Sequence, residues 1–384
     1  FGGVGFTSSS ELGDLNDLWR FNPGIGQWTW VSGSSTASAV GVYGTQGVAA
    51  PGNVPGARRN AAQWVDLSGQ LWLLGGSGFD SANRGYLNDL WRFHPATGLW
   101  TWVAGSSSIS GLGVYGTRGV ASPGNTPGAR DMATSWIDAS GDLWLFGGTG
   151  LSSTTSARSL NDLWRFRPSS GLWTWMGGSS TADAAGAYGT RGVASVNNMP
   201  GGRYGATSWI DPSGHVWLFG GYGNDAAGAF GLLNDLWRFN PATGQWAWVS
   251  GSSTRAVPGV YGTVGTPTAD TGPGARSLPT SWIDGSGNLW LFGGYGYGAS
   301  ASFGDLDDVW RFSASSGQWT WVAGSTNPGA PAVYGSKGTP SPDNTPGGRG
   351  RAAAWFDRSA NVWLFGGASA NGEVLHNDLW RRGP

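Results

Sequence analysis

Five tyrosines recur at regular intervals, each followed by Gly and then Thr or Ser: Tyr43, Tyr115, Tyr188, Tyr261 and Tyr334. Exposed tyrosine rings with nearby arginines, here Arg118 and Arg191, are suited to stacking on sugars or to binding a partner protein. The alternative is that each tyrosine packs its long, Gly- and Pro-rich segment down onto its own repeat unit. A residue that recurs in every unit usually serves every unit, so the sequence favours packing. The five tyrosines and two arginines are nevertheless the candidate binding residues.

A second recurring set of residues combines acids with arginines. These carboxylates could form a metal-binding ring, but one carboxylate per unit lacks the neighbouring oxygen ligands that a hard cation needs. We therefore expect a structural network of hydrogen bonds, and we predict no metal and no cofactor. The acids are Asp17, Asp89, Asp162, Asp235, Asp308 and Asp378, and the arginines are Arg58, Arg130, Arg203, Arg276 and Arg349.

Groups that could perform catalysis are scarce. The chain has no Cys, and its histidines, His94, His215 and His376, occupy different places in the repeat. No sequence typical of a nucleophilic Ser, a zinc protease or a phosphate-binding loop is present. The repeat units can be compared with one another as an internal alignment, in which a single active site would appear as one unit with additional acids, bases or histidines. The differences between the units are mild and predict no catalytic residue. A glycan-active hydrolase or lyase with paired carboxylates is the alternative. Departures that could contribute to binding are Arg84, Tyr86, Tyr295 and Tyr297.

All of these residues are positioned by an internal repeat. The heptapeptide Leu-Asn-Asp-Leu-Trp-Arg-Phe occurs four times unchanged and twice in altered form. Its tryptophans, spaced 70–73 residues apart, are Trp19, Trp91, Trp164, Trp237, Trp310 and Trp380. Within one domain, 1–384, the predicted units are 1–57 (partial), 58–129, 130–202, 203–275, 276–348 and 349–384 (partial).

Four segments of each unit have the pattern of β-strands. In the unit 203–275 these are 206–211, 216–221, 234–239 and 246–249, which are rich in bulky apolar residues and separated by turn residues. Four antiparallel strands repeated radially predict a β-propeller. The connections between strands one and two and between strands three and four are short, whereas the other two connections are long and variable. Function concentrates on loops held by a rigid scaffold, so we place the candidate binding surface on the long-loop face.

The repeat resembles the kelch repeat. The resemblance rests on the opening Arg, a strand that ends in Gly-Gly, the Asn-Asp-Leu-Trp motif and a final Trp-rich strand, and it covers essentially the whole chain. It implies a β-propeller of four-stranded antiparallel blades. Kelch units usually have ~50 residues, so these longer units are more similar to Trp- and Gly-rich kelch proteins of environmental bacteria. We expect about six modules, four complete and two partial; a five-bladed closed ring is the alternative.

Composition narrows the class of partner. The net charge is −1 and only 12% of residues are charged, which disfavours nucleic acid, and no apolar run is long enough to span a membrane. We expect an extracellular or cell-surface bacterial protein, or alternatively a periplasmic one. Because it starts at Phe1 inside a repeat, we expect a processed product or an excerpt of a longer chain.

The predicted function is a non-catalytic scaffold that binds a protein or a glycan through the long-loop face. The alternative is a structural subunit of a surface assembly or filament, which would self-assemble through partial terminal blades whose strand edges remain open.

Overall fold

The computed structural model describes residues 1–384 except 23, 358, 360, 370–373 and 384. Every regular element among the described residues is a β-strand, and every strand pair is antiparallel. No described helix is long and apolar enough to cross a membrane. The contacts divide the chain into two compact halves, 1–184 and 185–384.

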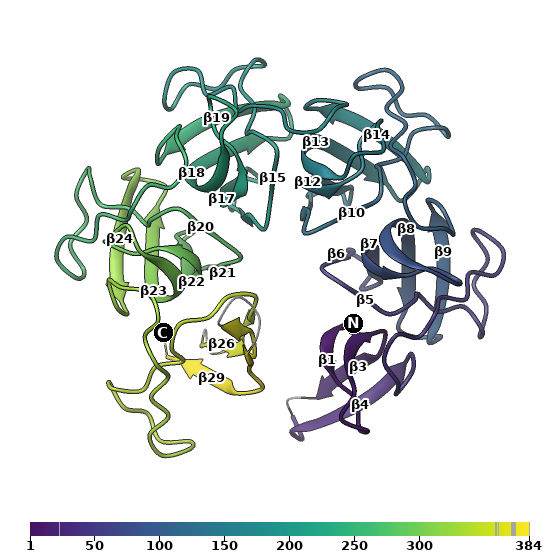
Figure 1. The fold of residues 1–384 in the computed structure, drawn as a ribbon, viewed down its shortest axis with the longest axis horizontal. Coiled ribbons are helices and arrows are strands. Elements are labelled where there is room, and N and C mark those ends of the chain that lie inside the picture. The colour runs from purple at the N-terminus through teal and green to yellow at the C-terminus, as the bar shows by residue number, and fades with distance from the viewer. Residues whose placement is uncertain (23, 358, 360, 370–373, 384) are drawn as a thin grey trace. The chain divides into compact units, whose positions relative to one another are not determined.

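The first complete blade lies in the N-terminal half (Figure 1). Its long second strand, β7, pairs with β8, which pairs with β9. The two ends of β7 pair with β5 and β6, because the left-handed backbone of Asn60 (φ 56°) breaks the first strand. The sequence predicts the part after this break and misses the short strand before it. The bounds are β5 (Arg58–Arg59), β6 (Ala62–Val65), β7 (Leu71–Phe79), β8 (Arg84–His94) and β9 (Leu99–Ala104).

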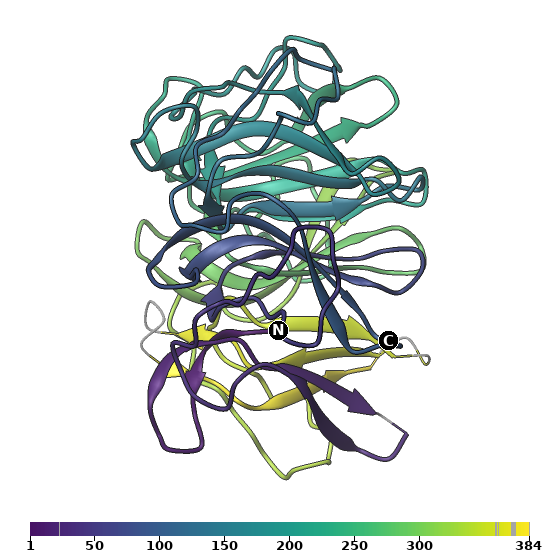
Figure 2. The same ribbon diagram turned by 90° about the vertical axis from the view of Figure 1, so that its right-hand side faces the viewer.

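Three further blades repeat this strand order, one in the N-terminal half and two in the C-terminal half. Seen from the side in Figure 2, the strands have the twist expected of antiparallel sheets. The N-terminal half adds β10 (Arg130–Asp131), β11 (Thr134–Ile137), β12 (Leu143–Gly150), β13 (Arg158–Arg167) and β14 (Leu172–Gly177). The C-terminal half contains β15 (Arg203–Tyr204), β16 (Thr207–Ile210), β17 (Val216–Asn224), β18 (Phe230–Asn240), β19 (Gln245–Ser250), β20 (Arg276–Ser277), β21 (Thr280–Ile283), β22 (Leu289–Tyr297), β23 (Phe303–Ser313) and β24 (Gln318–Ala323).

The double glycine of each blade forms a β-bulge. In β7 the pairing with β8 shifts register between Leu74 and Gly76, and both Gly75 (φ 62°) and Gly76 (φ 96°) have left-handed backbones. A Cβ atom on Gly75 would lie 2.7 Å from the carbonyl oxygen of Leu87. Only glycine fits this combination of backbone angle and close approach, which explains why the pair recurs in the sequence.

Shorter sheets occur at the two ends of the chain, where β1 pairs with β2, β3 with β4, β26 with both β25 and β29, and β27 with β28. The described residues thus form four five-stranded sheets and one three-stranded sheet, besides the two-stranded pairs. The fold is a five-bladed β-propeller, which matches the alternative count, and the six repeat units correspond to four complete blades and two partial sets of strands. The bounds are β1 (Gly3–Phe6), β2 (Leu12–Leu15), β3 (Leu18–Asn22), β4 (Gln27–Ser32), β25 (Ala353–Phe356), β26 (Val362–Phe365), β27 (Ala368–Ser369), β28 (Val374–Leu375) and β29 (Leu379–Arg382).

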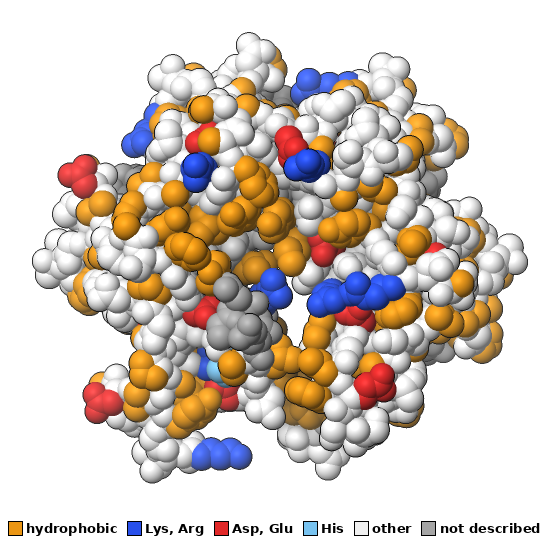
Figure 3. Space-filling model, in the orientation of Figure 1, with side chains coloured by type: hydrophobic (Ala, Val, Ile, Leu, Met, Phe, Trp, Pro, Cys, Tyr) orange, Lys and Arg blue, Asp and Glu red, His pale blue; other side chains and the backbone are white. Residues whose placement is uncertain are grey.

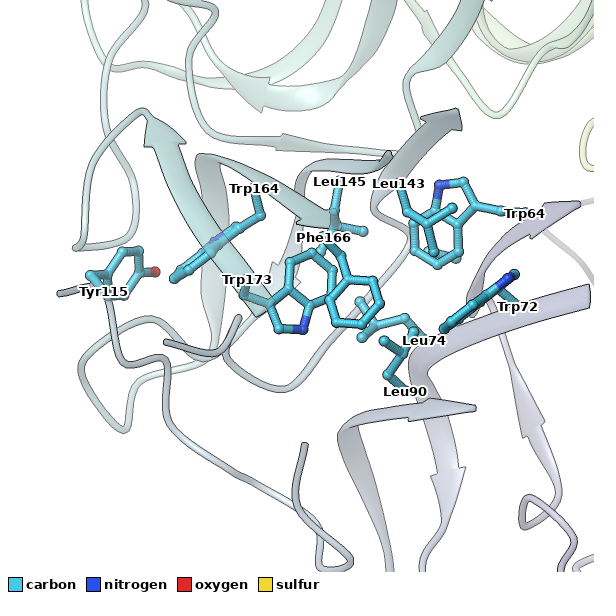
Figure 4. Packing of buried hydrophobic residues seen from close by; sticks show 11 residues of the cluster. Trp64, Trp72, Leu74, Leu90, Tyr115, Leu143, Leu145, Trp164, Phe166 and Trp173 are labelled. Atoms are coloured by element: carbon cyan, nitrogen blue, oxygen red, sulfur yellow. The ribbon is translucent and has the colours of Figure 1, made fainter. Parts of the chain in front are cut away.

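Tryptophans fill the space between neighbouring blades of each half. Figure 4 shows this packing in the N-terminal half, where Trp64 and Trp72 of one blade approach the leucines and Phe166 of the next. The indole N–H of Trp64 donates to the carbonyl oxygen of Trp136 over 2.9 Å, and the ring of Trp72 lies 5.7 Å from that of Phe166. Burial of these large apolar rings, each removing roughly 150–250 Å² from water, supplies the main favourable term for blade association.

Candidate functional site

Each complete blade holds a buried cluster of one Arg, one Asp, one Tyr and one Trp. In the blade that follows Gly128, Arg130 donates through Nη1 and Nη2 to the two carboxylate oxygens of Asp162, over 2.6 and 2.7 Å. The Tyr115 hydroxyl and the Trp164 indole N–H both donate to Oδ2 of Asp162, over 2.8 and 2.7 Å. The same contacts recur around Asp89, Asp235 and Asp308.

This cluster leaves little capacity for a ligand. The side chains of Arg130 and Asp162 are 1% and 0% exposed. The remaining guanidinium donors of Arg130 reach the carbonyl oxygens of Gly128 and Gly147 over 3.0 and 2.9 Å. A buried ion pair whose donors and acceptors are satisfied in this way positions strands rather than substrates. The structure forms the predicted Arg–Asp pairs in every complete blade and pairs Arg349 with Asp378, while the described partner of the Asp17 side chain is Trp19.

The long segment that carries each tyrosine spans two consecutive blades. The segment 105–129 stays attached to its own blade through Asn88, whose side-chain nitrogen donates to the carbonyl oxygen of Pro127 over 3.1 Å. Its Tyr115, however, contacts the following blade, with ring centres 5.0 Å from Trp164 and 5.3 Å from Trp175. The expectation that the tyrosine packs onto its own repeat unit is therefore wrong, because Tyr115 fixes the segment to the next unit.

Four of the five repeated tyrosines are buried. Tyr43, Tyr115 and Tyr188 are 7% exposed and Tyr261 is 5% exposed. Tyr334 is 55% exposed, although its hydroxyl still donates to Asp378 over 2.9 Å. Among the described residues, the C-terminal sheet β25–β26–β29 has no fourth strand to cover the Tyr334 ring as Trp175 covers Tyr115. The buried four are placed for packing, and a binding role for the set stays a prediction.

The buried tyrosines predict a loss of stability in alkali. Burial first, and then the negative charge of the neighbouring Asp, raise the pKa of Tyr43, Tyr115, Tyr188 and Tyr261 well above its ordinary value. The folded chain keeps these protons where the unfolded chain, with a tyrosine pKa of about 10, loses them. Their contribution is therefore complete below pH ~10 and falls as the pH rises further, by at most about 1.4 kcal/mol per pH unit for each tyrosine.

The test of this alkaline effect is urea unfolding of the wild type and of Tyr115→Phe between about pH 9 and pH 11. The variant should lose one tyrosine's share of the slope of unfolding free energy against pH. Tyr334→Phe, which changes an exposed ring, is the matched control and should alter the slope less. An identical slope in Tyr115→Phe and the wild type would show that Tyr115 ionises equally in the folded and unfolded states.

The two predicted arginines of the long segments, Arg118 and Arg191, are both exposed and both hold the following blade. Arg118 Nε donates to the carbonyl oxygen of Met176 over 3.0 Å. Arg191 Nη2 donates to the carbonyl oxygen of Gly251 over 2.7 Å, and its guanidinium lies 4.5 Å from the ring centre of Trp248. Both side chains thus attach the long segment to the following blade and remain exposed to solvent. Their part in binding stays a prediction.

A set of positions next to the double glycines varies from blade to blade, and we call these the rim positions. They are the places of Arg59, Ser77, Phe79, Arg84 and Tyr86 in the first complete blade, where the paired ends of β5, β7 and β8 meet. Their equivalents follow from the strand registers of the other blades. Because the scaffold contacts described above do not involve them, rim residues can change without loss of the fold.

In the first complete blade of the N-terminal half, two of the rim positions, Arg59 and Arg84, carry charge. The carboxylate of Asp14, from β2, contacts Arg59 Nε at 3.1 Å and accepts a hydrogen bond from Arg84 Nε over 2.8 Å. Tyr86 is half-buried; burial and the negative charge of Asp131 raise its pKa. The predicted binding residues Arg84 and Tyr86 thus lie on the same strand but face different carboxylates.

In the C-terminal half the rim positions carry aromatic rings. Tyr204 and Tyr222 stack with ring centres 5.7 Å apart, and Phe230 meets Tyr222 edge to face at 4.9 Å. On the next blade, Phe303 lies 5.6 Å from Tyr295 and 5.5 Å from Tyr297. Phe230 and Phe303 are 44% and 54% exposed.

The structure therefore brings the predicted Tyr295 and Tyr297 together around Phe303, which the sequence did not single out. Tyr204, Tyr222 and Phe230 form an equivalent group that was also missed. The signal was present, because an alignment of repeat units on the heptapeptide places both phenylalanines in the column of Arg84, three residues before its first Leu. Comparison of columns between units, rather than inspection of motifs within them, would have revealed the difference.

An apolar cavity of about 190 Å³ lies in the N-terminal half beside the first complete blade. At the junction between that blade and the next, Trp64 and Trp72 pack with the leucines of the following blade. Among its lining residues, Leu71 and Leu73 are the equivalents of Leu143 and Leu145, which contact that tryptophan pair at the next junction. Its lining is Phe1, Leu18, Gln63, Trp64, Val65, Leu71, Trp72, Leu73 and Trp100.

Metal ligands and charges are sparse on the described part of the chain. No group of three or more His, Cys, Asp or Glu residues able to hold a metal ion occurs among the described residues. Two of the histidines have local partners: His215 lies 3.4 Å from Asp211, and the His376 ring is 3.0 Å from Ser369 Oγ. Figure 3 shows few charged side chains on the face in view, where uncharged and hydrophobic groups dominate.

Comparison with known proteins leaves the family open. No model of a protein family matches the chain, and no curated protein matches it. The fold and the site together define a β-propeller with a repeated interior cluster and a rim that differs between blades. The resemblance to kelch repeats rests on the sequence motifs alone.

Proposed function

We propose that the chain is a kelch-type, non-catalytic binding scaffold that takes a glycan through the aromatic groups of its rim and long-loop face. The observation that carries this proposal is the pair of partly exposed groups Tyr204–Tyr222–Phe230 and Tyr295–Tyr297–Phe303. In the first complete blade the equivalent positions hold Arg59, Ser77 and Arg84, and only the equivalent of Tyr297, Phe79, is aromatic. A location outside the bacterial cell or on its surface fits a ligand of this kind.

The chemistry of the rim supports a largely neutral ligand with apolar faces. Phe230 and Phe303, both in the C-terminal half, are half-exposed. Exposed apolar rings forgo the stability that burial would give them, and a ligand that covers them would recover it. Pyranose rings present C–H faces that pack on such aromatic surfaces, while their hydroxyls bond to backbone groups at strand ends. Rigid aromatic rings lose little conformational entropy on binding, which favours them as ligand contacts.

The variant Phe303→Ala tests this proposal. We expect it to weaken binding to the best ligand of an oligosaccharide array by about threefold to tenfold, because it removes one aromatic contact. The matched control is Phe356→Ala, which removes a phenylalanine that is 39% exposed outside the rim. Array binding should be followed by titration of each variant with the selected sugar. Equal affinity of Phe303→Ala and the wild type, or selection only of a protein partner from an extract, would contradict glycan recognition at this rim.

A second candidate, a structural subunit of a surface assembly, is favoured by a different observation. On β3 and β4, Trp19, Trp28 and Trp30 are 49%, 57% and 50% exposed. Exposed indoles beside a strand edge favour contact with another chain. Sedimentation velocity over a wide concentration range decides this question, since an assembly subunit should form larger species and a monomeric scaffold should not.

A further inference from the structure

The rim of the N-terminal half contains a second candidate site, built from Asp14, Arg59 and Arg84. Asp14 belongs to β2, whereas the two arginines come from β5 and β8 of the following blade. The Asp14 side chain is 4% exposed, and the two arginine side chains are 39% and 42% exposed. One buried carboxylate therefore holds two half-exposed guanidinium groups.

We propose that Arg59 and Arg84, held by Asp14, bind an oxyanion group of a ligand, a carboxylate or a sulfate. This inference does not rest on the proposed function, because it uses other residues in the other half of the chain. Two positive charges contact the single negative charge of Asp14, so the three side chains together carry a net charge of +1, while the buried carboxylate of Asp131 adds a negative charge nearby. A bound oxyanion would contact the guanidinium groups directly.

The geometry leaves the terminal nitrogens of both arginines available. Each arginine faces Asp14 with its Nε atom, at 3.1 Å for Arg59 and 2.8 Å for Arg84. No hydrogen bond from an Nη atom of either residue is described in the structure. The planar Nη donors of a guanidinium match the oxygens of a carboxylate or sulfate, and such charge-assisted bonds are among the stronger ones.

Asp14 also reduces the entropic cost of binding. An isolated surface arginine has many rotamers, and ordering it opposes ligand capture. Because both guanidinium groups contact the two oxygens of one carboxylate, they are held close together before a ligand arrives. The nearby carboxylate of Asp131 is buried and accepts a hydrogen bond from Asn60, so it has its own donor.

The repeat shows that this arrangement is not required by the scaffold. The equivalents of Arg59 in the later blades are Asp131, Tyr204 and Ser277, and the register equivalents of Arg84 on the C-terminal blades are Phe230 and Phe303. Those blades keep the same strand order. Among the rim positions of the four complete blades, two arginines beside one acid therefore occur in the first blade only; away from the rim, Asp142 contacts Arg165 and Arg167.

The test titrates the full chain by calorimetry with sodium sulfate and, separately, with sodium glucuronate, at constant ionic strength. The wild type should show saturable binding of one oxyanion. Arg84→Gln and Arg59→Gln should each weaken it by about tenfold or more, as expected for loss of a charge-assisted bond. The matched control is Arg158→Gln, an exposed arginine of the next blade that pairs weakly with Asp183 at 3.8 Å and should leave binding unchanged.

Each outcome of this titration is informative. Binding of sulfate alone would show that the site accepts tetrahedral oxyanions. Binding of glucuronate, alone or together with sulfate, would show that it also accepts carboxylates. Each of these results supports the proposal. Absence of saturable binding of both anions to the wild type overturns it, as does equal weakening by Arg158→Gln, which would indicate general charge attraction. Thermal unfolding with increasing concentrations of each anion separates the roles, because binding raises the melting temperature of the wild type with oxyanion concentration, whereas a purely structural ion pair changes the melting temperature by the same amount at every concentration. The sugar titration of Phe303→Ala reads out the aromatic rim independently.

Discussion

Asp162→Asn should lower the free energy of unfolding by about 3–5 kcal/mol, the range expected when one partner of a buried ion pair is removed. The substitution keeps the shape of the side chain but leaves the Arg130 guanidinium buried without a compensating charge. It also weakens the acceptor for the hydroxyl of Tyr115 and the indole N–H of Trp164. Urea unfolding followed by tryptophan fluorescence measures the loss.

Two further variants make this expectation specific. Asp270→Asn changes an exposed carboxylate and should leave the unfolding midpoint unchanged within error. The double variant Asp162→Leu/Arg130→Met removes both charges and should recover part of the lost stability, because well-packed apolar residues can replace a buried ion pair. A double variant less stable than Asp162→Asn would indicate that the charged pair itself stabilises the blade.

The blade architecture could be predicted because its signals are local. A double glycine with two left-handed backbones, short turns between apolar segments and a fixed repeat length all act within a few residues or recur at constant spacing. The Arg–Asp pair was predicted because both residues recur together in the units. The break in the first strand at Asn60 was missed because the residue at the break is Asn, Met, Gly, Leu or Arg in successive units, which gives no common letter to recognise.

The target of the tyrosine was mispredicted because it depends on tertiary structure. Tyr115 reaches Asp162, 47 residues later and across a blade boundary. Nothing in the segment 105–129 distinguishes its own blade from the next, since both carry the same Asp-Leu-Trp motif. The repeat makes the architecture predictable. For the same reason, it does not indicate whether the tyrosine of a long segment contacts its own blade or the next one.

The candidate rim was only partly predictable for a related reason. Tyr295 and Tyr297 attract attention as two tyrosines separated by one glycine, whereas Phe303 stands alone in a loop-like stretch of the sequence. The ring of Phe303 joins them because β22 and β23 pair Tyr297 directly with Phe303. Arg84 and Asp14 are 70 residues apart, and only the packing of two modules brings them together.

The repeated heptapeptide Leu-Asn-Asp-Leu-Trp-Arg-Phe contains the same tryptophan in different surroundings. Substitution of that tryptophan in two copies compares the effect of burial at constant local sequence. Trp19 and Trp237 occupy the same place in identical seven-residue segments, and the indole N–H of each donates to the Asp two residues earlier, over 2.6 and 2.7 Å. Trp237 is fully buried, with rings of Tyr188 at 4.8 Å and Trp246 at 6.4 Å, whereas Trp19 is 49% exposed.

Trp237→Ala should therefore destabilise the chain by about 3–5 kcal/mol, as expected for a large aromatic side chain removed from a packed core. Trp19→Ala should cost less, about 2 kcal/mol, because half of the ring is already in water. Urea unfolding of the two variants, with secondary structure followed by circular dichroism, gives the comparison directly. Equal costs would mean that the heptapeptide acts through its local Asp–Trp hydrogen bond. Unequal costs would mean that its repetition serves the packing of one blade against the next, because the same seven residues stabilise the chain only where a neighbouring blade buries them.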